Sequence, residues 1–258
     1  MPLLDPFGKP LSLTTPPRRI ISLVPSLTEL LYDLGLDAEV VGITKFCIHP
    51  ESWFRSKTRV GGTKTVHIQQ ALALAPDLVL ANKEENVRAQ VEELARTVPT
   101  WVSDIANLDE AIAAIGAIGT LTHREEAARS LADRIRSGFA ALPPLPARRP
   151  RAGYLIWKDP YMSVGHNTFI HDLMERLGVE NAFAGHSRYP EVTVEDLRSC
   201  TLLLLSSEPY PFAQKHIDEL RAQLPGTKIL LVDGELFSWY GSRLLHTPAY
   251  FEELRQAL

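Results

Sequence analysis

The stretch over residues 122–142 constrains the fold of this chain more than any other. Its apolar residues recur four apart, which is the spacing of one helical face: Leu131, Ile135 and Phe139. Thr122 and Glu125 have the spacing of a capping box, and no proline interrupts the stretch. The sequence therefore predicts one continuous helix of about 30 Å, because each helical residue adds about 1.5 Å.

Alternating strand and helix signals lie on both sides of this stretch. Buried-strand runs are predicted at 18–24, 40–43, 76–81 and 100–103 before it, and at 152–157, 201–205 and 228–232 after it. Helices are predicted at 26–35, 68–75 and 86–97, and again at 167–178, 194–199, 211–224 and 248–257. Ser26 and Glu29 form a second capping-box pair, and the first helix of each half ends in Leu-Gly.

The repeated order predicts an α/β protein with two Rossmann-like lobes joined by one long backbone helix. The predicted limits are 1–121 for the N-terminal lobe, 122–142 for the helix and 143–258 for the C-terminal lobe. The alternative is a helix packed inside one large α/β domain.

Composition excludes several classes of protein. With 258 residues and a net charge of −4, the chain has no basic surface of the kind that binds nucleic acid. Cys47 and Cys200 fall in different halves, which argues against a disulfide framework. No apolar run is long enough for a membrane span. We expect a monomer.

The first 17 residues lack the basic segment followed by an apolar segment that is typical of a secretory signal. We therefore expect a cytoplasmic protein as the sequence stands. If a leader has been removed, we expect a periplasmic or extracytoplasmic one.

Aromatic residues gather in the loops that follow the predicted strands. These are Phe46, Trp157, Tyr161, Tyr210, Trp239 and Tyr240. Because ligands of parallel sheets bind beyond the carboxyl ends of the strands, the loops predict a cleft for a bulky ligand with flat apolar walls. The alternative is that the rings are ordinary core residues.

Cys47 and His49 are candidates for two other kinds of chemistry. Thiolate and imidazole bind metals, but a zinc site needs three or four such ligands, and the other histidines are scattered. A Cys–His nucleophilic pair would need a third orienting group. Gly61–Lys64 lacks the full phosphate-loop pattern and predicts a turn that presents Lys64. We expect no catalytic residue, no metal site and no resident cofactor.

Four motifs carry a resemblance to a known family: residues 19–30, 41–44, 60–63 and 75–80. In this order they are similar to the helical-backbone (class III) substrate-binding proteins of ABC importers. The resemblance covers roughly residues 18–256. It lies with the group that binds cobalamin, ferric siderophores and haem, and within that group nearest the cobalamin binders. It implies the periplasmic-binding-protein fold and a non-enzymatic transport role, with a corrinoid or other metal chelate held between the lobes.

The resemblance also suggests roles for individual residues. The aromatic positions of the cobalamin binders fall on Phe46, Trp157, Tyr189, Trp239 and Tyr240. The full predicted ligand-binding set is Lys45, Phe46, Cys47, His49, Lys64, Asn82, Trp157, Tyr161, Tyr189, Trp239, Tyr240 and Arg243. Family members dock onto an ABC permease through one carboxylate on each lobe. Glu195 matches the second position, but the first falls on Gln69, which has no charge.

Two departures from the family keep other ligands and functions open: the uncharged Gln69 at the first docking position, and the altered aromatic wall of the first lobe. Polar residues stand near Thr63 and Asn82 where the family has tryptophans, and Lys45, Lys64 and Lys83 add positive charge, which favours a more anionic ligand. A ferric-siderophore, haem or metal-ion receptor is one alternative. A cytosolic enzyme or trafficking chaperone that acts through Cys47 and His49 is another.

Overall fold

The computed structural model describes residues 3–258, which form two compact units. The first unit holds the chain up to Ile105, Asp109–Ser137 and Tyr240–Leu245. The second holds Ala106–Leu108, Gly138–Trp239 and His246–Leu258. The predicted division into 1–121, 122–142 and 143–258 stays a prediction.

The first unit contains a five-stranded parallel sheet in the order β3-β2-β1-β4-β5. Its strands are β1 (Ile20–Ser22), β2 (Val40–Ile43), β3 (Thr58–Arg59), β4 (Leu78–Asn82) and β5 (Thr100–Ser103). The central strands β1 and β4 are buried at every residue. Helices therefore cover both faces of the sheet, as continuous apolar strands require.

Among residues 3–258, six helices and one 3₁₀ turn belong wholly or mainly to this unit. They are α1 (Pro25–Asp33), α2 (Glu51–Ser56), α3 (Ile68–Ala73), α4 (Arg88–Ala95), α5 (Leu108–Thr122), α6 (Glu125–Ala140) and η1 (Ser242–Leu245). One face of the sheet packs on α3 and α4 through Ala71, Val91 and Leu94. Successive strand residues point to opposite faces, so Ile21 and Val79 share this core.

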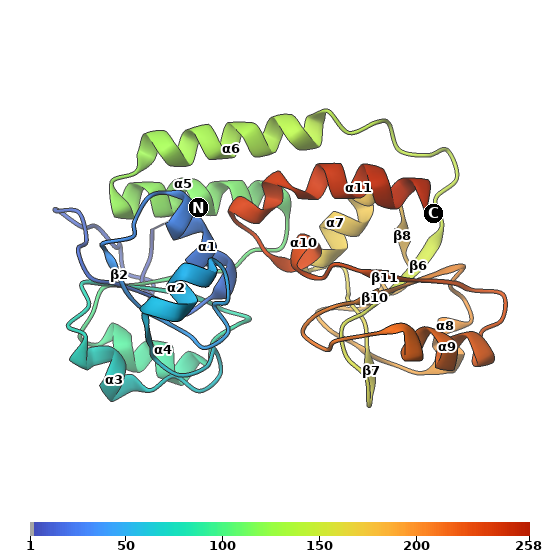
Figure 1. Ribbon diagram of the computed structural model, residues 1–258, viewed down its shortest axis with the longest axis horizontal. Coiled ribbons are helices and arrows are strands. Elements are labelled where there is room, and N and C mark those ends of the chain that lie inside the picture. The colour runs from blue at the N-terminus through green and yellow to red at the C-terminus, as the bar shows by residue number, and fades with distance from the viewer. Residues whose placement is uncertain (1–2) are drawn as a thin grey trace. The chain divides into compact units, whose positions relative to one another are not determined.

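The long predicted helix is present, but its start was predicted wrongly. Thr122 is the last residue of α5, where its hydroxyl donates to the carbonyl of Ile118 at 2.7 Å, and is not the cap of α6. A turn through His123, with φ of 53°, reverses the chain before α6 begins at Glu125. The two helices lie side by side (Figure 1). The hydroxyl of a threonine in the last turn of a helix can donate to the carbonyl four residues back. This bond is an alternative to capping the next helix.

The first helix also begins differently from the prediction. Pro25 occupies its first position with Val24 as N-cap, and no side chain caps the helix end. Proline suits this position because the missing N–H has no helical partner there. Glu29 instead pairs with Arg243. The predicted end is confirmed, since Gly35 follows the helix with φ of 73°, a conformation that favours glycine.

The second unit contains a parallel sheet in the order β11-β10-β6-β8 and a small antiparallel pair, β7 with β9. The strands are β6 (Arg151–Leu155), β7 (Tyr161–Met162), β8 (Glu180–Asn181), β9 (Glu191–Val192), β10 (Leu202–Ser206) and β11 (Lys228–Val232). The helices are α7 (Phe169–Leu177), α8 (Val194–Leu197), α9 (Gln214–Gln223), α10 (Glu235–Ser238) and α11 (Thr247–Gln256). One core joins α8 and α9 to the sheet through Leu197, Ile217 and Leu203.

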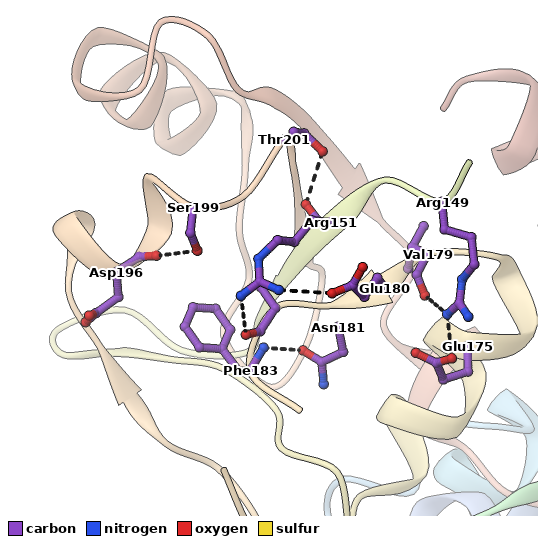
Figure 2. Close-up of polar contacts among 11 residues, drawn as sticks. Arg149, Arg151, Glu175, Val179, Glu180, Asn181, Phe183, Asp196, Ser199 and Thr201 are labelled. Atoms are coloured by element: carbon purple, nitrogen blue, oxygen red, sulfur yellow. Dashed lines mark hydrogen bonds and ion pairs between the residues drawn. The ribbon is translucent and has the colours of Figure 1, made fainter. Parts of the chain in front are cut away.

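Two arginines fix the start of β6 to the chain that leads into and out of β8 (Figure 2). Arg151 donates to the Glu180 carboxylate at 3.0 Å and to the carbonyl of Ala182 at 3.1 Å. Arg149 pairs with Glu175 near the end of α7. These contacts hold the amino-terminal side of the sheet, which leaves the loops at the carboxyl ends for function.

The α/β class with parallel sheets in two lobes is confirmed. Within residues 3–258, no helix combines the length and the apolar character that a membrane span requires.

Candidate functional site

In the first unit, the loop after β2 presents an exposed aromatic ring. Phe46 is 51% exposed, and the Lys45 ammonium lies 5.1 Å from the centre of its ring. Both side chains rest against Gly62, where a Cβ would stand 3.2 Å from the Phe46 ring and 3.3 Å from the Lys45 stem. The predicted turn at Gly61–Lys64 therefore packs directly against the side chains of Lys45 and Phe46.

Cys47 points into the protein instead. Its side chain is fully buried, and its sulfur lies 3.1 Å from the hydroxyls of Thr28 and Thr44. Burial raises the pKa of the thiol. Since the thiolate is the reactive form of cysteine, this position is unsuited to nucleophilic chemistry. His49, two residues on, is half-buried.

Asn82 shapes the loop after β4. It is 3% exposed, and its side-chain oxygen accepts from the backbone N–H of Glu84 at 2.8 Å and of Glu85 at 3.0 Å. Its amide group donates to the carbonyl and the hydroxyl of Ser103 at 3.1 and 3.0 Å. All the polar atoms of Asn82 are thus engaged in holding β4, β5 and the loop together.

Lys64 lies beside this loop. Its ammonium donates to the carbonyl of Glu84. Burial raises the pKa of the neighbouring Glu85, while the charge of Lys64 opposes that shift. The predicted lysine is therefore placed against the acidic loop that Asn82 holds.

Tyr240 and Arg243 reach the first unit from the C-terminal part of the chain. Arg243 donates through Nε and Nη2 to the two carboxylate oxygens of Glu29, at 2.9 and 2.6 Å. Only 16% and 19% of these two side chains are exposed. Tyr240 is 8% exposed, and burial raises its pKa. The ion pair between Arg243 and Glu29 fixes residues 240–245 to α1.

In the second unit, Trp157 follows β6 and is 42% exposed. Its ring meets that of Tyr210 edge-on, with 5.7 Å between centres. Tyr161 and Tyr189 lie in or next to the small antiparallel ladder of this unit. Tyr161 is the first residue of β7, and Tyr189 stands two residues before β9, the strand that pairs with β7. Both are half-buried. The β7–β9 ladder pairs Tyr161 with Val192, three residues beyond Tyr189, and so places the two predicted residues on neighbouring segments.

Trp239 is the last residue of the second unit before the chain enters the first unit at Tyr240. It is 7% exposed, and its indole N–H donates to Glu208 at 2.9 Å. The hydroxyl of Ser238 donates to the same carboxylate oxygen at 2.5 Å. Glu208 is an acceptor that sequence reasoning did not single out, because nothing in a Ser-Ser-Glu-Pro loop indicates an indole partner.

Among the predicted ligand-binding residues, those of the first unit are Lys45, Phe46, Cys47, His49, Lys64, Asn82, Tyr240 and Arg243. The second unit holds Trp157, Tyr161, Tyr189 and Trp239. Their roles toward a ligand stay predictions. The aromatic residues Tyr210 and Phe212 and their neighbour His216 were not among them, although Tyr210 was one of the strand-end aromatics.

The two positions considered for permease docking are both at the surface. The side chain of Glu195 on α8 is 80% exposed and pairs with Arg198 at 2.6 Å. Gln69 is exposed on α3.

Each unit also has a surface hollow. The one in the first unit, of about 520 Å³, lies between Leu4–Asp5 and α5. The one in the second, of about 600 Å³, lies between Ser207 and Tyr250. None of the predicted ligand-binding residues lines either hollow, so the hollows do not coincide with the aromatic loops. Within residues 3–258, no three His, Cys, Asp or Glu side chains gather as a metal site would need.

Comparison with known proteins adds to this geometry. Residues 20–200 match the family described as periplasmic binding protein. A Vitamin B12-binding protein of Yersinia pestis (strain Pestoides F) is 28% identical over 183 residues, which make up 69% of this chain and 65% of the relative. The match thus spans less than two thirds of that relative's length.

Solved structures share the fold. A periplasmic haem-binding protein from Roseiflexus sp. RS-1 aligns with a TM-score of 0.77 at 20% identity, covering 93% of this chain and 97% of that one. The periplasmic vitamin B12 binding protein of Vibrio cholerae aligns with a TM-score of 0.74 at 19% identity, covering 94% and 99%.

These findings confirm the predicted resemblance. Because the matched residues make up more than half of the chain, the protein belongs to the periplasmic binding protein family.

Proposed function

We propose that this protein binds a bulky corrinoid, or a related metal chelate, through the loops at the carboxyl ends of its two parallel sheets. The observation that carries the proposal is the exposure of Phe46 and Trp157, at 51% and 42%, at those loops. The chain buries most of its large aromatic side chains, so exposed rings at strand ends indicate a ligand that covers them. The names of the relatives, which bind vitamin B12 or haem, support the same class.

The two rings supply a useful part of the affinity. A large aromatic side chain buries about 150–250 Å², so covering the exposed half of each ring removes on the order of 100 Å² from water. At about 25 cal/mol per Å², this contributes roughly 2 kcal/mol per ring. Micromolar binding needs about 8 kcal/mol, so the two rings supply about half.

Polar groups provide the rest, and the structure ranks the candidates. Lys45 is exposed and forms no ion pair with any of residues 3–258, so its ammonium is available to a ligand acceptor. Asn82 and Arg243 already bond their own unit, and a direct contact would have to displace those bonds. We therefore assign Lys45 to the ligand and regard Asn82 and Arg243 as supports for the loops.

The test is calorimetric titration of the purified protein with cyanocobalamin, dicyanocobinamide, haem and a ferric siderophore. Saturable binding of the two corrinoids is expected, and the variants Phe46→Ala and Trp157→Ala should each weaken it by about 2 kcal/mol, a factor of about 30. Tyr32→Phe is the matched control, because Tyr32 lies on α1 and contacts Trp53. Binding of haem alone or of the siderophore alone would show that the ligand is that chelate and not a corrinoid. No binding of any of the four would refute the proposal.

The enzyme alternative makes a different prediction. If Cys47 and His49 carried out chemistry on a bound ligand, Cys47→Ala would abolish turnover. We expect this variant to bind cyanocobalamin as the unchanged protein does, because the thiol is buried and its pKa is raised. Conversion of the ligand by the unchanged protein, absent in the variant, would favour the enzyme.

We propose an ABC permease as the partner, with Glu195 as one docking residue. Its exposure on α8 supports this role. Glu195→Gln should reduce ligand-dependent stimulation of the permease ATPase in reconstituted vesicles and leave ligand affinity unchanged. Full stimulation by the variant would remove Glu195 from the interface.

A further inference from the structure

The second unit contains a cluster of four rings from the loops after β6 and β10 and the first turn of α9. We call Trp157, Tyr210, Phe212 and His216 the aromatic cluster. Tyr210 is its centre: its ring lies 5.7 Å from Trp157, 4.7 Å from Phe212 and 5.4 Å from His216, between ring centres. Its backbone N–H donates to the carbonyl of Ile156 at 3.3 Å, which ties the two loops together.

Exposure changes steeply across the aromatic cluster. Trp157 is 42% exposed, Tyr210 is half-buried and His216 is 2% exposed. Tyr210 therefore stands between an open ring that a ligand can reach and a closed polar group that it cannot. In this position, the buried His216 can fix the orientation of the Tyr210 hydroxyl that faces the surface.

The hydrogen bonds of His216 fix which of its nitrogens carries the proton. The backbone N–H of Ala213, the N-cap of α9, donates to Nδ1 at 2.8 Å. Nδ1 must therefore be unprotonated, and a neutral imidazole carries its proton on the other nitrogen. Nε2 lies 3.3 Å from the Tyr210 hydroxyl oxygen, so the imidazole is the donor and the tyrosine oxygen the acceptor.

This assignment leaves the hydrogen of the Tyr210 hydroxyl unused. Within residues 3–258, the hydroxyl makes no other hydrogen bond than that with His216. A hydroxyl has one donor and two acceptor positions. Since His216 occupies an acceptor position, the hydroxyl retains its single donor for a partner outside the protein.

We propose that Tyr210 contacts the ligand and donates its hydroxyl hydrogen to a carbonyl oxygen of it, with His216 as the positioning residue that fixes this direction. This inference rests on the proposed function and specifies it further. The peripheral amide groups of a corrinoid offer such oxygens, and they lie beside a flat ring system that suits Trp157. His216 acts only through Tyr210, because it is buried.

The rival reading is structural: the tyrosine oxygen would serve only to satisfy the buried imidazole. The two readings differ in what Tyr210→Phe does to affinity. In the structural reading the variant lowers stability and leaves ligand affinity unchanged. In the proposed one it also removes a bond that exists only in the complex.

The experiment measures the dissociation constant of cyanocobalamin by titration calorimetry for the unchanged protein, Tyr210→Phe and the control Tyr32→Phe. We expect Tyr210→Phe to weaken binding about three- to tenfold, the size of one net hydrogen bond, and Tyr32→Phe to leave it unchanged. Unchanged affinity in Tyr210→Phe would overturn the inference while the proposed function stood. Failure of the unchanged protein to bind would overturn both.

His216 is tested by rescue. His216→Phe should weaken binding to a similar extent, whereas His216→Gln should restore it, because a glutamine at the third helical position can accept from the N-cap N–H and donate onward. In the His216→Phe background, adding Tyr210→Phe should change affinity less than it does alone. Fully additive effects, or no rescue by glutamine in a folded variant, would remove His216 from its positioning role.

Discussion

The contact between α5 and α6 makes a sharp prediction about two glycines of one helix. Gly116 and Gly119 both lie inside α5. A Cβ at Gly116 would meet nothing within 4 Å, whereas a Cβ at Gly119 would stand 2.5 Å from the Cβ of Ala128 on α6. Replacing each by alanine therefore makes the same chemical change in two opposite environments.

The expected magnitudes follow from two terms. Alanine in place of glycine in a helix interior stabilises by about 1 kcal/mol, and Gly116→Ala should gain that amount. Gly119→Ala gains the same helix term but loses about 1–3 kcal/mol to overpacking, because neither the methyl of Ala128 nor the backbone behind it can move aside freely. The variants should differ by about 1–3 kcal/mol, with Gly119→Ala the less stable.

Urea denaturation followed by far-UV circular dichroism measures this difference, and thermal unfolding should show Gly116→Ala melting about 2–4 °C higher than the unchanged protein. The double variant Gly119→Ala with Ala128→Gly removes the clash. We expect it to recover most of the overpacking cost, as a positive coupling in a double-mutant cycle. Equal stabilities of the two single variants would refute the close packing of α5 on α6 at this point.

Three further predictions concern single groups. Glu29→Gln should destabilise the protein by about 1–3 kcal/mol, since it leaves the half-buried guanidinium of Arg243 without its carboxylate, and hydrogen exchange should show residues 240–245 opening more often. Burial lowers the pKa of His216, so its contribution to stability should be complete above about pH 6.5 and be lost as the pH falls from there toward the folded-state pKa; a His216→Gln variant should show a flatter urea-midpoint profile over that range. Cys47 should react with a thiol reagent at the rate of local opening and speed up sharply in urea, whereas fast labelling in native buffer would contradict its burial.

The sequence predicted most of the scaffold because strand and helix signals are local. The runs at 78–80 and 202–205 are apolar at every residue, and both form strands buried on both faces. The helix ends at Gly35 and Gly178 were also predictable, because glycine after a helix favours the left-handed conformation that ends it. Both glycines have positive φ in the structure. The start of α6 was not, because Thr122 could satisfy either helix and only the turn at His123 decides between them.

The short pieces of structure were missed for a related reason. Residues 44–66 have no clear periodicity, yet they contain α2 and β3. Six helical residues and a two-residue strand are too short to repeat a pattern, so their conformation depends on contacts with the rest of the unit.

The candidate site was predictable in its aromatic residues and much less so in its charges. A strand-end ring such as Trp157 can be located from local sequence, because the strand before it is locally encoded. The partner of a charge cannot, because Lys83 pairs with Asp104 and Arg243 with Glu29, over 21 and 214 residues. The positive charge that favoured a more anionic ligand is therefore largely balanced within the first unit, where Lys64 also lies beside Glu84 and Glu85.

This balance bears on the ligand. A chelate with ionised carboxylates at its edge needs cations that are not already paired. Of Lys45, Lys64, Lys83 and Arg243, only Lys45 is well exposed and has no hydrogen bond or ion pair to a residue within 3–258. A ligand with neutral amides needs donors for its carbonyl oxygens, which Lys45 and the hydroxyl of Tyr210 provide, and neutral amides cost much less to desolvate than ionised carboxylates. We therefore expect cyanocobalamin to bind more tightly than haem, and the difference to change little between 50 and 500 mM salt. A strong weakening of corrinoid binding by salt would show that screened charge pairs, rather than neutral hydrogen bonds, hold the ligand.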